Sequence, residues 1–335
     1  MVLRSSGSLA SCDEGAAPRI QWRDRAGISP ASRHKPGRRA LAKAVSGTCW
    51  KCAPVLRSLI AILVLLTVAA APPSPRIVTL VPSLSEDAFA VGANVVAVSR
   101  FTDDSPQARS LPKVADFQSV DVEEIVRLHP DVVIGIPAQE RFVGPLRRAG
   151  IRVVLIPDDT FEDIFRDLHA IGELSDRTAQ ATRLIARLHR ETAKLQATVK
   201  PGYRPSVFFA LGTGPIWTVG PHSYIATLVE MAGGRNAADD LSSPWGEYSE
   251  EALLRAQPDA IVAGHETDLR SVIGREPWRS LRAVREGHVF SISDQRIADA
   301  LYRPGPRYTE GLRWLIERLS SLSTPKTQNA RSNRN

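Results

Sequence analysis

Two stretches of sequence, FQSVDVEEIVRLHPDVVIG at residues 117–135 and WGEYSEEALLRAQPDAIVAG at residues 245–264, decide the fold. Each contains an aromatic residue, a glutamate six positions later, a Pro-Asp pair and an apolar run, and the two copies are 128 residues apart. The segment before Pro-Asp has helical character, and the apolar run after it is typical of a buried strand. Because both stretches contain a helix followed by a buried strand, they predict two related α/β halves.

Strand-like and helical segments alternate around both copies. Strands are expected at 76–82, 95–99, 131–136, 151–157, 206–211, 259–263 and 289–293, and helices at 122–128, 139–149, 224–231, 250–256 and 308–322. Ser83, with Glu86 three residues later, is typical of a capping box that opens a further helix. The alternation predicts an α/β fold with mostly parallel sheets, each covered by helices.

A nearly continuous helical pattern separates the two halves. Residues 176–200 contain no glycine or proline, and a helix of that length exceeds about 30 Å at about 1.5 Å per residue. The predicted organisation is therefore an N-terminal α/β lobe at 76–172, a linking helix at 173–200, a C-terminal α/β lobe at 203–322 and a disordered tail at 323–335.

Charge and cysteine are concentrated at the N-terminus. Eleven of the 43 basic residues but only three of the 36 acidic residues lie in residues 1–71, so the remainder carries 32 basic and 33 acidic residues. All three cysteines also precede residue 72. The net charge of +7 is thus no indication of a nucleic-acid-binding face on the folded part. Disulfides, thiolate nucleophiles and cysteine-ligated zinc are excluded there as well.

The segment VLRSLIAILVLLTVAAA at residues 55–71 has the pattern of a signal peptide. A basic flank precedes an apolar run at 59–68, and small residues follow. The apolar run is shorter than the roughly 18 to 20 residues that a membrane-spanning helix needs. We therefore expect export to the periplasm with cleavage, and the alternative is a retained N-terminal membrane anchor. Residues 1–54 are interpreted as a disordered leader or a mis-assigned start.

Four residues of the repeat are candidates for function. Phe117 and Trp245 are expected in loops that face a cleft between the two lobes, where ligands of α/β sheets bind. Glu123 and Glu251 are expected in the first turns of their helices, where the helix dipole stabilises an acid. A pair of acids related by pseudo-symmetry also suits a two-fold symmetric partner that carries arginines.

Enzymatic motifs are missing from the sequence. It contains neither a G-x-S-x-G nucleophile elbow nor a GK[ST] phosphate loop. Its histidines show no grouping of three with a carboxylate, as a zinc site would need. We predict a binding protein without catalytic residues, metal ligands or cofactor. The alternative from another class is a two-lobed enzyme that acts on a ligand in the cleft.

A series of motifs resembles a known family. The series comprises RIVTLVPSLSE (76–86), LPKVADFQ (111–118), DVEEIVRLHPDVVIG (121–135), WTVG (217–220), PWGEYSEEALLRAQPDAIV (244–262) and RPGPR (303–307). Together with the long helix, it resembles the periplasmic substrate-binding proteins of the iron-siderophore and cobalamin ABC importers, closest to the cobalamin-binding members. The resemblance implies two Rossmann-like lobes bridged by a rigid helix, and binding without catalysis.

The resemblance also implies the ligand and its contacts. Phe117 and Trp245 would be aromatic walls against a corrin ring, and Phe101 and Trp217 match two further aromatic positions. The polar pair near the edge of the ligand would be Asp294 and Arg303. Ile136 and Asp104 stand where cobalamin binders tend to have aromatics. Cobalamin is therefore the expected ligand, and a ferric siderophore or haem on the same scaffold is the alternative.

Delivery of the ligand is the remaining implication. Glu123 and Glu251 would engage arginines of a dimeric ABC permease in the inner membrane, one glutamate from each lobe. The binding protein itself is expected to be a monomer that binds a small molecule and no nucleic acid.

Overall fold

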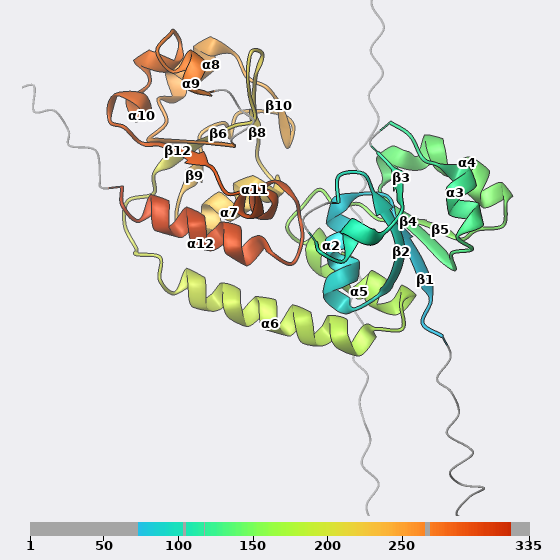
Figure 1. The fold of residues 1–335 in the computed structure, drawn as a ribbon. Helices are drawn as coiled ribbons and strands as arrows, with labels where there is room; N and C mark the ends of the chain where they lie inside the picture. The colour runs from blue at the N-terminus through green and yellow to red at the C-terminus, as the bar shows by residue number, and fades with distance from the viewer. Residues whose placement is uncertain (1–72, 103–104, 117, 265–268, 323–335) are drawn as a thin grey trace, which may run out of the picture. The chain divides into compact units, whose positions relative to one another are not determined.

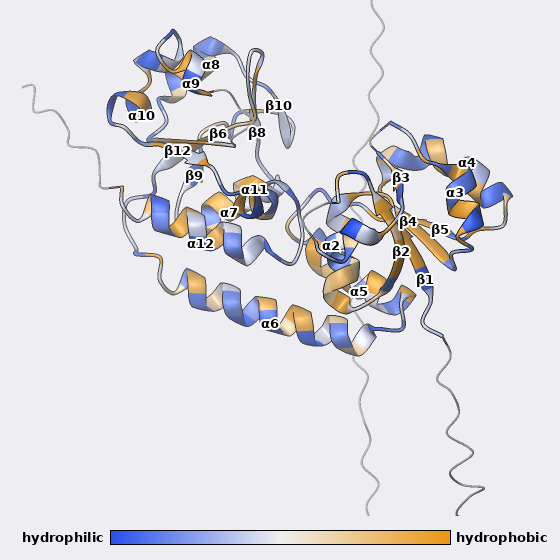
Figure 2. Cartoon of the chain, in the orientation of Figure 1, coloured by the Kyte–Doolittle hydropathy of each residue, from blue (hydrophilic) through white to orange (hydrophobic). Residues whose placement is uncertain are grey.

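A five-stranded parallel sheet forms the first half of the computed structural model, which describes residues 73–102, 105–116, 118–264 and 269–322. Its strand order is β3 (Lys113–Ala115), β2 (Asn94–Ser99), β1 (Arg76–Thr79), β4 (Val132–Gly135) and β5 (Val153–Leu155) (Figure 1). Every pairing is parallel, and β4 is buried along its whole length. This burial explains the apolar run in the sequence, and the central strands stand out as apolar in Figure 2.

Helices connect these strands. They are α2 (Pro82–Val91), α3 (Val122–Arg127), α4 (Glu140–Arg148) and α5 (Asp163–Leu174), with short 3-10 helices at Ala108–Ser110 and Pro137–Gln139. The predicted leader, signal peptide and tail, together with Phe117 and Asp104, lie outside the described residues. No helix within the described ranges is both long enough and apolar enough to cross a bilayer.

The second half contains a four-stranded parallel sheet. Its order is β12 (Val289–Ile292), β11 (Ala260–Gly264), β6 (Ser206–Ala210) and β9 (Arg235–Asn236). The helices of this half are α7 (Tyr224–Met231), α8 (Glu250–Ala256), α9 (Leu269–Val272), α10 (Arg282–Arg285), α11 (Gln295–Tyr302) and α12 (Tyr308–Leu319), with a 3-10 helix at Trp278–Ser280. The α/β prediction with parallel sheets is confirmed.

A small antiparallel sheet in the second half was not predicted. It consists of β10 (Trp245–Glu247), β8 (Ile216–Val219) and β7 (Gly212–Thr213). Its strands have two to four residues, too few to show a period of two. Trp245 therefore lies in a strand and not in the predicted loop.

The repeat in the sequence is also a repeat in local structure. Asp121 caps α3 by accepting a hydrogen bond from the backbone N–H of Glu124 at 3.0 Å, and Ser249 caps α8 in the same way from Ala252 at 3.1 Å. Both helices are followed by a residue with positive φ, His129 in the first copy and Gln257 in the second. Each turns the chain into the following Pro-Asp, so the two copies share their helix start and their exit.

The aspartate of each Pro-Asp pair joins two neighbouring strands. The Asp131 carboxylate accepts a hydrogen bond from the backbone N–H of Arg76, the first residue of β1, at 2.7 Å. In the second copy, the Asp259 carboxylate accepts one from the N–H of Ser206, the first residue of β6, at 2.8 Å. The backbone N–H of Asp131 in turn donates to the carbonyl of Arg76, and the N–H of Asp259 donates to the carbonyl of Ser206. The Pro-Asp landmark therefore fixes the register of the central strand pair in both sheets.

The linking helix is shorter than predicted. The structure has α6 at Thr178–Gln196, and the expected helix over 173–200 is interrupted because α5 ends at Leu174. Asp176 adopts a positive φ of 57° at the break. Because the segment contains no glycine or proline, the sequence pattern gave no indication of this turn. The division of the chain into domains stays a prediction.

The core continues along α6 from one half to the other. Leu184, Leu188 and Leu195 belong to a single cluster of buried apolar residues that includes Ile77 of β1 and Val207 of β6. The helix packs against α2 and α5 of the first half and against α12 of the second. Burial of apolar surface on α6 thus stabilises both halves together.

Candidate functional site

Two tryptophans share one face of the small antiparallel sheet. Trp217 of β8 lies opposite Glu247 of β10, and Val219 lies opposite Trp245. Side chains alternate along a strand, so residues two apart point the same way and the two indoles are diagonal neighbours on one face. Trp217 is 39% exposed and Trp245 is 62% exposed. Large aromatic rings left open in this way are suited to contact with a flat ligand.

A third exposed aromatic comes from the first half. Phe101 follows β2 and is 49% exposed. Like the two tryptophans, it is accessible at the surface, as the ligand prediction requires. Phe117, its predicted partner in the first half, lies outside the described residues, and the register of the antiparallel sheet places the two aromatics of the second half together.

The predicted polar pair falls at the two ends of α11. The Asp294 carboxylate accepts a hydrogen bond from the backbone N–H of Arg296 at 2.9 Å and so caps the helix. Arg303 follows the helix and forms ion pairs with Asp299 at 3.2 Å and with Glu86 at 3.7 Å. The Asp294 carboxylate therefore caps α11, and the Arg303 guanidinium is paired with carboxylates of the protein itself.

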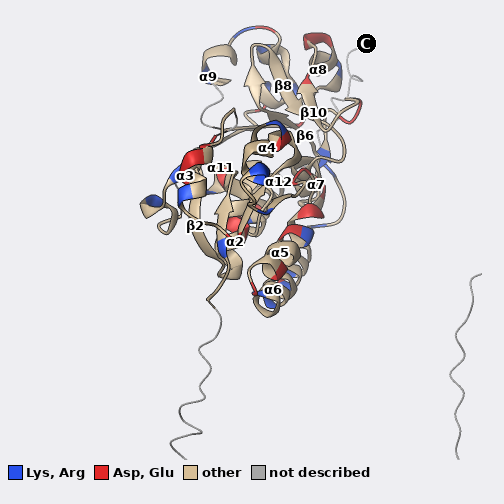
Figure 3. Ribbon diagram, turned by 90° about the vertical axis from the view of Figure 1, so that its right-hand side faces the viewer, with Lys and Arg blue, Asp and Glu red and all other residues tan. Residues whose placement is uncertain are grey.

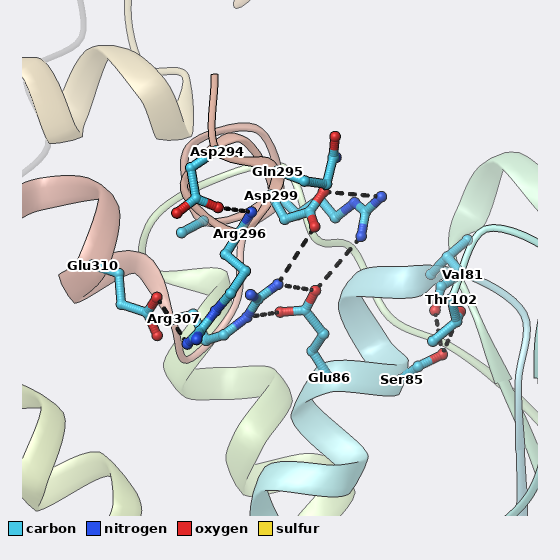
Figure 4. A network of polar contacts seen from close by, with 12 residues as sticks. Val81, Ser85, Glu86, Thr102, Asp294, Gln295, Arg296, Asp299, Arg307 and Glu310 are labelled. Atoms are coloured by element: carbon cyan, nitrogen blue, oxygen red, sulfur yellow. Dashed lines mark hydrogen bonds and ion pairs between the residues drawn. The ribbon is translucent and has the colours of Figure 1, made fainter. Parts of the chain in front are cut away.

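A charged network joins α2 of the first half to the segment between α11 and α12 of the second (Figure 4). The Arg307 guanidinium donates two hydrogen bonds to the Glu86 carboxylate, at 2.9 and 3.1 Å. The Glu86 side chain is only 13% exposed and that of Arg307 only 24%. Burial of the guanidinium lowers the pKa of Arg307, but the hydrogen bond and the charge of Glu86, with the charge of Asp299, raise it above its ordinary value.

This network was missed by sequence reasoning. Glu86 was predicted to complete a capping box with Ser83, but α2 has Val81 at its N-cap and no side-chain capping bond. The Ser83 hydroxyl instead donates to Asp158. The partners of Glu86 lie more than 200 residues along the chain, so no local pattern could have indicated them.

A pocket of about 470 Å³ opens beside this network. It is lined from both halves, by Glu86, Phe89 and Ser105 of the first and by Arg296, Pro306 and Arg307 of the second. The volume is in the range of small-molecule sites. None of the three exposed aromatics lines it, so the pocket and the tryptophan face are separate features of the described structure.

Two buried acids of the first half, Asp87 and Asp167, interact with each other and with the half-buried Asp158. Asp87 of α2 and Asp167 of α5 are each 1% exposed, and Asp158 lies in the segment between β5 and α5. Burial raises the pKa of Asp167 to about 8, with a further contribution from the charge of Asp158. Burial, followed by the charge of Asp167, raises the pKa of Asp87 well above its ordinary value. At neutral pH the Asp167 carboxyl is therefore mostly protonated inside the fold.

Replacing Asp167 with asparagine is expected to flatten the pH dependence of stability. A carboxyl whose pKa is higher in the folded state stabilises fully below its unfolded pKa near 4, and this contribution is lost as the pH rises towards 8. Between these limits, the free energy of unfolding of the wild type should fall by about 1.4 kcal/mol per pH unit relative to that of Asp167→Asn. Urea unfolding at pH 5, 6 and 7 measures the difference, and parallel curves for the two proteins would contradict the assignment.

The two glutamates of the repeat are exposed on their helices. Glu123 lies in the first turn of α3 and Glu251 in the first turn of α8, and both helices carry acidic residues in Figure 3. No hydrogen bond or ion pair is formed by either side chain within the described ranges. Both carboxylates are therefore available to a partner.

Metal binding finds no support in the described residues. Nowhere among them do three His, Cys, Asp or Glu side chains gather into a group that could hold a metal ion.

Known proteins resemble the chain over both halves of the fold. A family model described as periplasmic binding protein matches residues 77–295. The chain is 30% identical over 269 residues to the vitamin B12-binding protein of Pectobacterium carotovorum subsp. carotovorum (strain PC1), covering 78% of this chain and 94% of that protein. It is 28% identical over 253 residues to the uncharacterized ABC transporter substrate-binding lipoprotein YvrC of Bacillus subtilis (strain 168), covering 72% and 79%.

Among solved structures, the periplasmic vitamin B12 binding protein BtuF of Vibrio cholerae superposes with a TM-score of 0.63 at 26% identity. The superposition covers 74% of this chain and 98% of that one. The similarity thus extends across both sheets and the helix between them.

Proposed function

The chain belongs to the periplasmic binding protein family, and on that premise we propose that it captures a corrinoid outside the cytoplasmic membrane and delivers it to an ABC permease. The observation that carries the proposal is the shared face of Trp217 and Trp245. Two exposed indoles side by side offer a broad apolar surface, which suits a large flat macrocycle better than a small polar solute. Relatives named for vitamin B12 binding support the same class of ligand.

Binding and release are the whole of the proposed activity. Glu247 lies opposite Trp217, the Ser243 hydroxyl donates to the Trp245 carbonyl at 2.9 Å, and the buried acids Asp87 and Asp167 are enclosed in the first half. No nucleophile paired with a base accompanies the tryptophan face in the described structure, as covalent catalysis would need. The ligand is therefore expected to leave the protein chemically unchanged.

Titration of the purified protein tests the ligand. Cyanocobalamin, haemin and a ferric hydroxamate siderophore are added separately while tryptophan emission is followed. Because Trp217 and Trp245 are exposed, a ring stacked on them should quench their emission. We expect saturable quenching at the lowest concentration of cyanocobalamin. Tighter saturation by haemin or by the siderophore would assign the scaffold to that ligand and reject the corrinoid.

The two glutamates provide the link to the permease in this proposal. Glu123→Ala combined with Glu251→Ala should leave corrinoid affinity unchanged and lower uptake by at least about tenfold, since each removed acid would leave an interfacial arginine unpaired. Uptake of labelled cyanocobalamin is measured in a strain whose own gene is replaced by the variant.

Glu124→Ala with Glu250→Ala is the matched control for that experiment. It removes two acids from the same helix turns but not the pair that the repeat relates. Equal loss of uptake in the two double variants would show that general charge, and not this pair, matters for delivery.

A further inference from the structure

A row of basic side chains follows one face of α6. The row consists of Arg183, Arg187, Arg190 and Lys194, whose spacing of four, three and four residues places them on the same side of the helix. All four residues are exposed, and α6 carries basic residues in Figure 3. The buried leucines of α6 lie on its other side, towards the core. We call these four residues the α6 basic row.

The α6 basic row has no acidic partner within the described ranges. Its side chains form no ion pair or hydrogen bond there. On other helices, Arg127, Arg147 and Arg318 each form an ion pair with an acid of their own helix. The single acid of α6, Glu191, is paired with Arg313 of α12 at 3.2 Å. The positive charge of the row is therefore available to an outside partner.

Helix stability does not account for the α6 basic row. Like charges four residues apart on a helix repel each other, as Arg183 and Arg187 do, and as Arg190 and Lys194 do. The helix dipole favours a cation in the last turn, which explains Lys194 but not the three arginines before it. Residues 72–335 carry nearly equal numbers of basic and acidic residues, so a general excess of positive charge does not explain the row either.

A depression in the surface adjoins the α6 basic row. It has a volume of about 410 Å³ and is lined by Gln180, Arg183, Arg187 and Arg190 of α6, with Ala90 of α2 on the other side. No acid of the described structure lines it. The guanidinium group donates two parallel hydrogen bonds to a phosphate group, and arginine is favoured wherever phosphate is recognised. Three arginines around one depression therefore fit a phosphate-bearing partner.

The described chain begins beside the same helix. Arg177, the residue before α6, donates from Nη2 to the Ser74 hydroxyl at 3.1 Å and from Nε to the Gly92 carbonyl at 3.0 Å. Only residues 72 and 73 separate Ser74 from the segment at 55–71, which is predicted to direct the chain through a membrane. Of the anionic partners outside the cytoplasm, a membrane surface is the one that this placement favours.

We propose that the α6 basic row binds the anionic phospholipid headgroups of a membrane surface. The arginines contact phosphate groups at the depression, and Lys194 extends the contact along the helix. Attraction of this kind falls off within a Debye length, so it keeps the protein close to the membrane without inserting any part of it. The inference goes beyond the proposed function and does not depend on the ligand, because no residue of the row belongs to the tryptophan face.

Sedimentation with lipid vesicles tests the proposal. The purified full chain is mixed with vesicles of phosphatidylcholine and phosphatidylglycerol in equal parts, or of phosphatidylcholine alone. We expect tighter binding to the anionic vesicles, weakened as salt is raised from about 0.1 M to about 1 M. Arg183→Gln with Arg187→Gln and Arg190→Gln should lower the affinity for anionic vesicles at least about tenfold, because each basic residue near an anionic surface contributes to binding. Equal affinity of wild type for both kinds of vesicle would overturn the proposal.

A second triple variant is the matched control. Arg270→Gln with Arg275→Gln and Arg285→Gln removes the same charge from exposed positions of the second half and should bind anionic vesicles as wild type does. Equal loss of affinity in the two triple variants would show that net charge, and not the α6 basic row, binds the membrane. Binding of wild type to a short DNA duplex but not to anionic vesicles would also overturn the proposal and assign the row to a soluble polyanion.

Lysine substitutions separate loss of charge from damage to the helix. Arg183→Lys with Arg187→Lys and Arg190→Lys keeps the three charges, and lysine is as good a helix former as arginine. This variant should retain most of the affinity for anionic vesicles. Loss of affinity as large as in the glutamine variant would contradict binding through the charge of the row. Urea unfolding should give the wild-type midpoint for all three triple variants, since every substituted side chain is exposed.

Discussion

Arg307→Ala should lower the free energy of unfolding by about 3 kcal/mol, the lower end of the range for removing one partner of a buried ion pair. The Glu86 side chain, which is 13% exposed beside Arg307, would lose its two hydrogen bonds at 2.9 and 3.1 Å. Arg303 remains 3.7 Å from Glu86 and compensates only in part. Because the pair joins α2 to the residues before α12, its loss should weaken the association of the two halves.

Arg313→Ala is the matched control for Arg307. Arg313 belongs to α12 and pairs with Glu191 of α6 at 3.2 Å, but the two side chains are 55% and 37% exposed. An exposed pair of this kind contributes about 0 to 1 kcal/mol. Urea unfolding of wild type and the two variants at one pH measures both effects. Equal losses in the two variants would show that burial of the Glu86 pair does not distinguish it from a surface ion pair.

Trp245→Ala should weaken corrinoid binding about 5- to 150-fold, which corresponds to the roughly 1–3 kcal/mol of a large aromatic contact. At 62% exposure the indole supports little of the protein core, so the fold should remain intact. Trp217→Ala should act in the same direction, since the two rings share a face of the antiparallel sheet.

Trp314→Ala is the control for loss of an indole elsewhere. Trp314 belongs to α12 and lies under the Arg318 guanidinium, which is 5.0 Å from its ring centroid. Its removal should leave the dissociation constant for cyanocobalamin unchanged. The constants are measured by equilibrium dialysis, which does not depend on tryptophan emission. Unchanged affinity in both the Trp217 and the Trp245 variants would remove the antiparallel sheet from the ligand site.

Local patterns in the sequence were sufficient to predict most of the parallel architecture. The helices at Tyr224–Met231 and Glu250–Ala256 begin and end where the patterns indicated. The Pro-Asp repeat predicted two related halves because each copy contains its own cap, turn and strand. These features depend on contacts within a few residues or with the adjacent strand.

Features that depend on distant contacts could not be predicted in this way. The pairing of Trp245 with β8 and the bonds between Glu86 and Arg307 join segments far apart in the chain. The turn between α5 and α6 depends on close packing, since a side chain on Gly172 would come within 2.6 Å of Ala181. The ligand-site assignment stays a prediction for Phe101, Trp217, Trp245, Asp294 and Arg303, as it does for the docking role of Glu123 and Glu251.

Capture of an intact corrinoid is the central claim, and competitive equilibrium dialysis tests it most directly. The purified protein is dialysed against equal concentrations of cyanocobalamin, haemin and a ferric hydroxamate siderophore, and the bound compounds are recovered and identified. We predict one corrinoid retained per chain and recovered chemically unchanged. Retention of haemin or the siderophore in its place, or recovery of an altered corrinoid, would contradict the account.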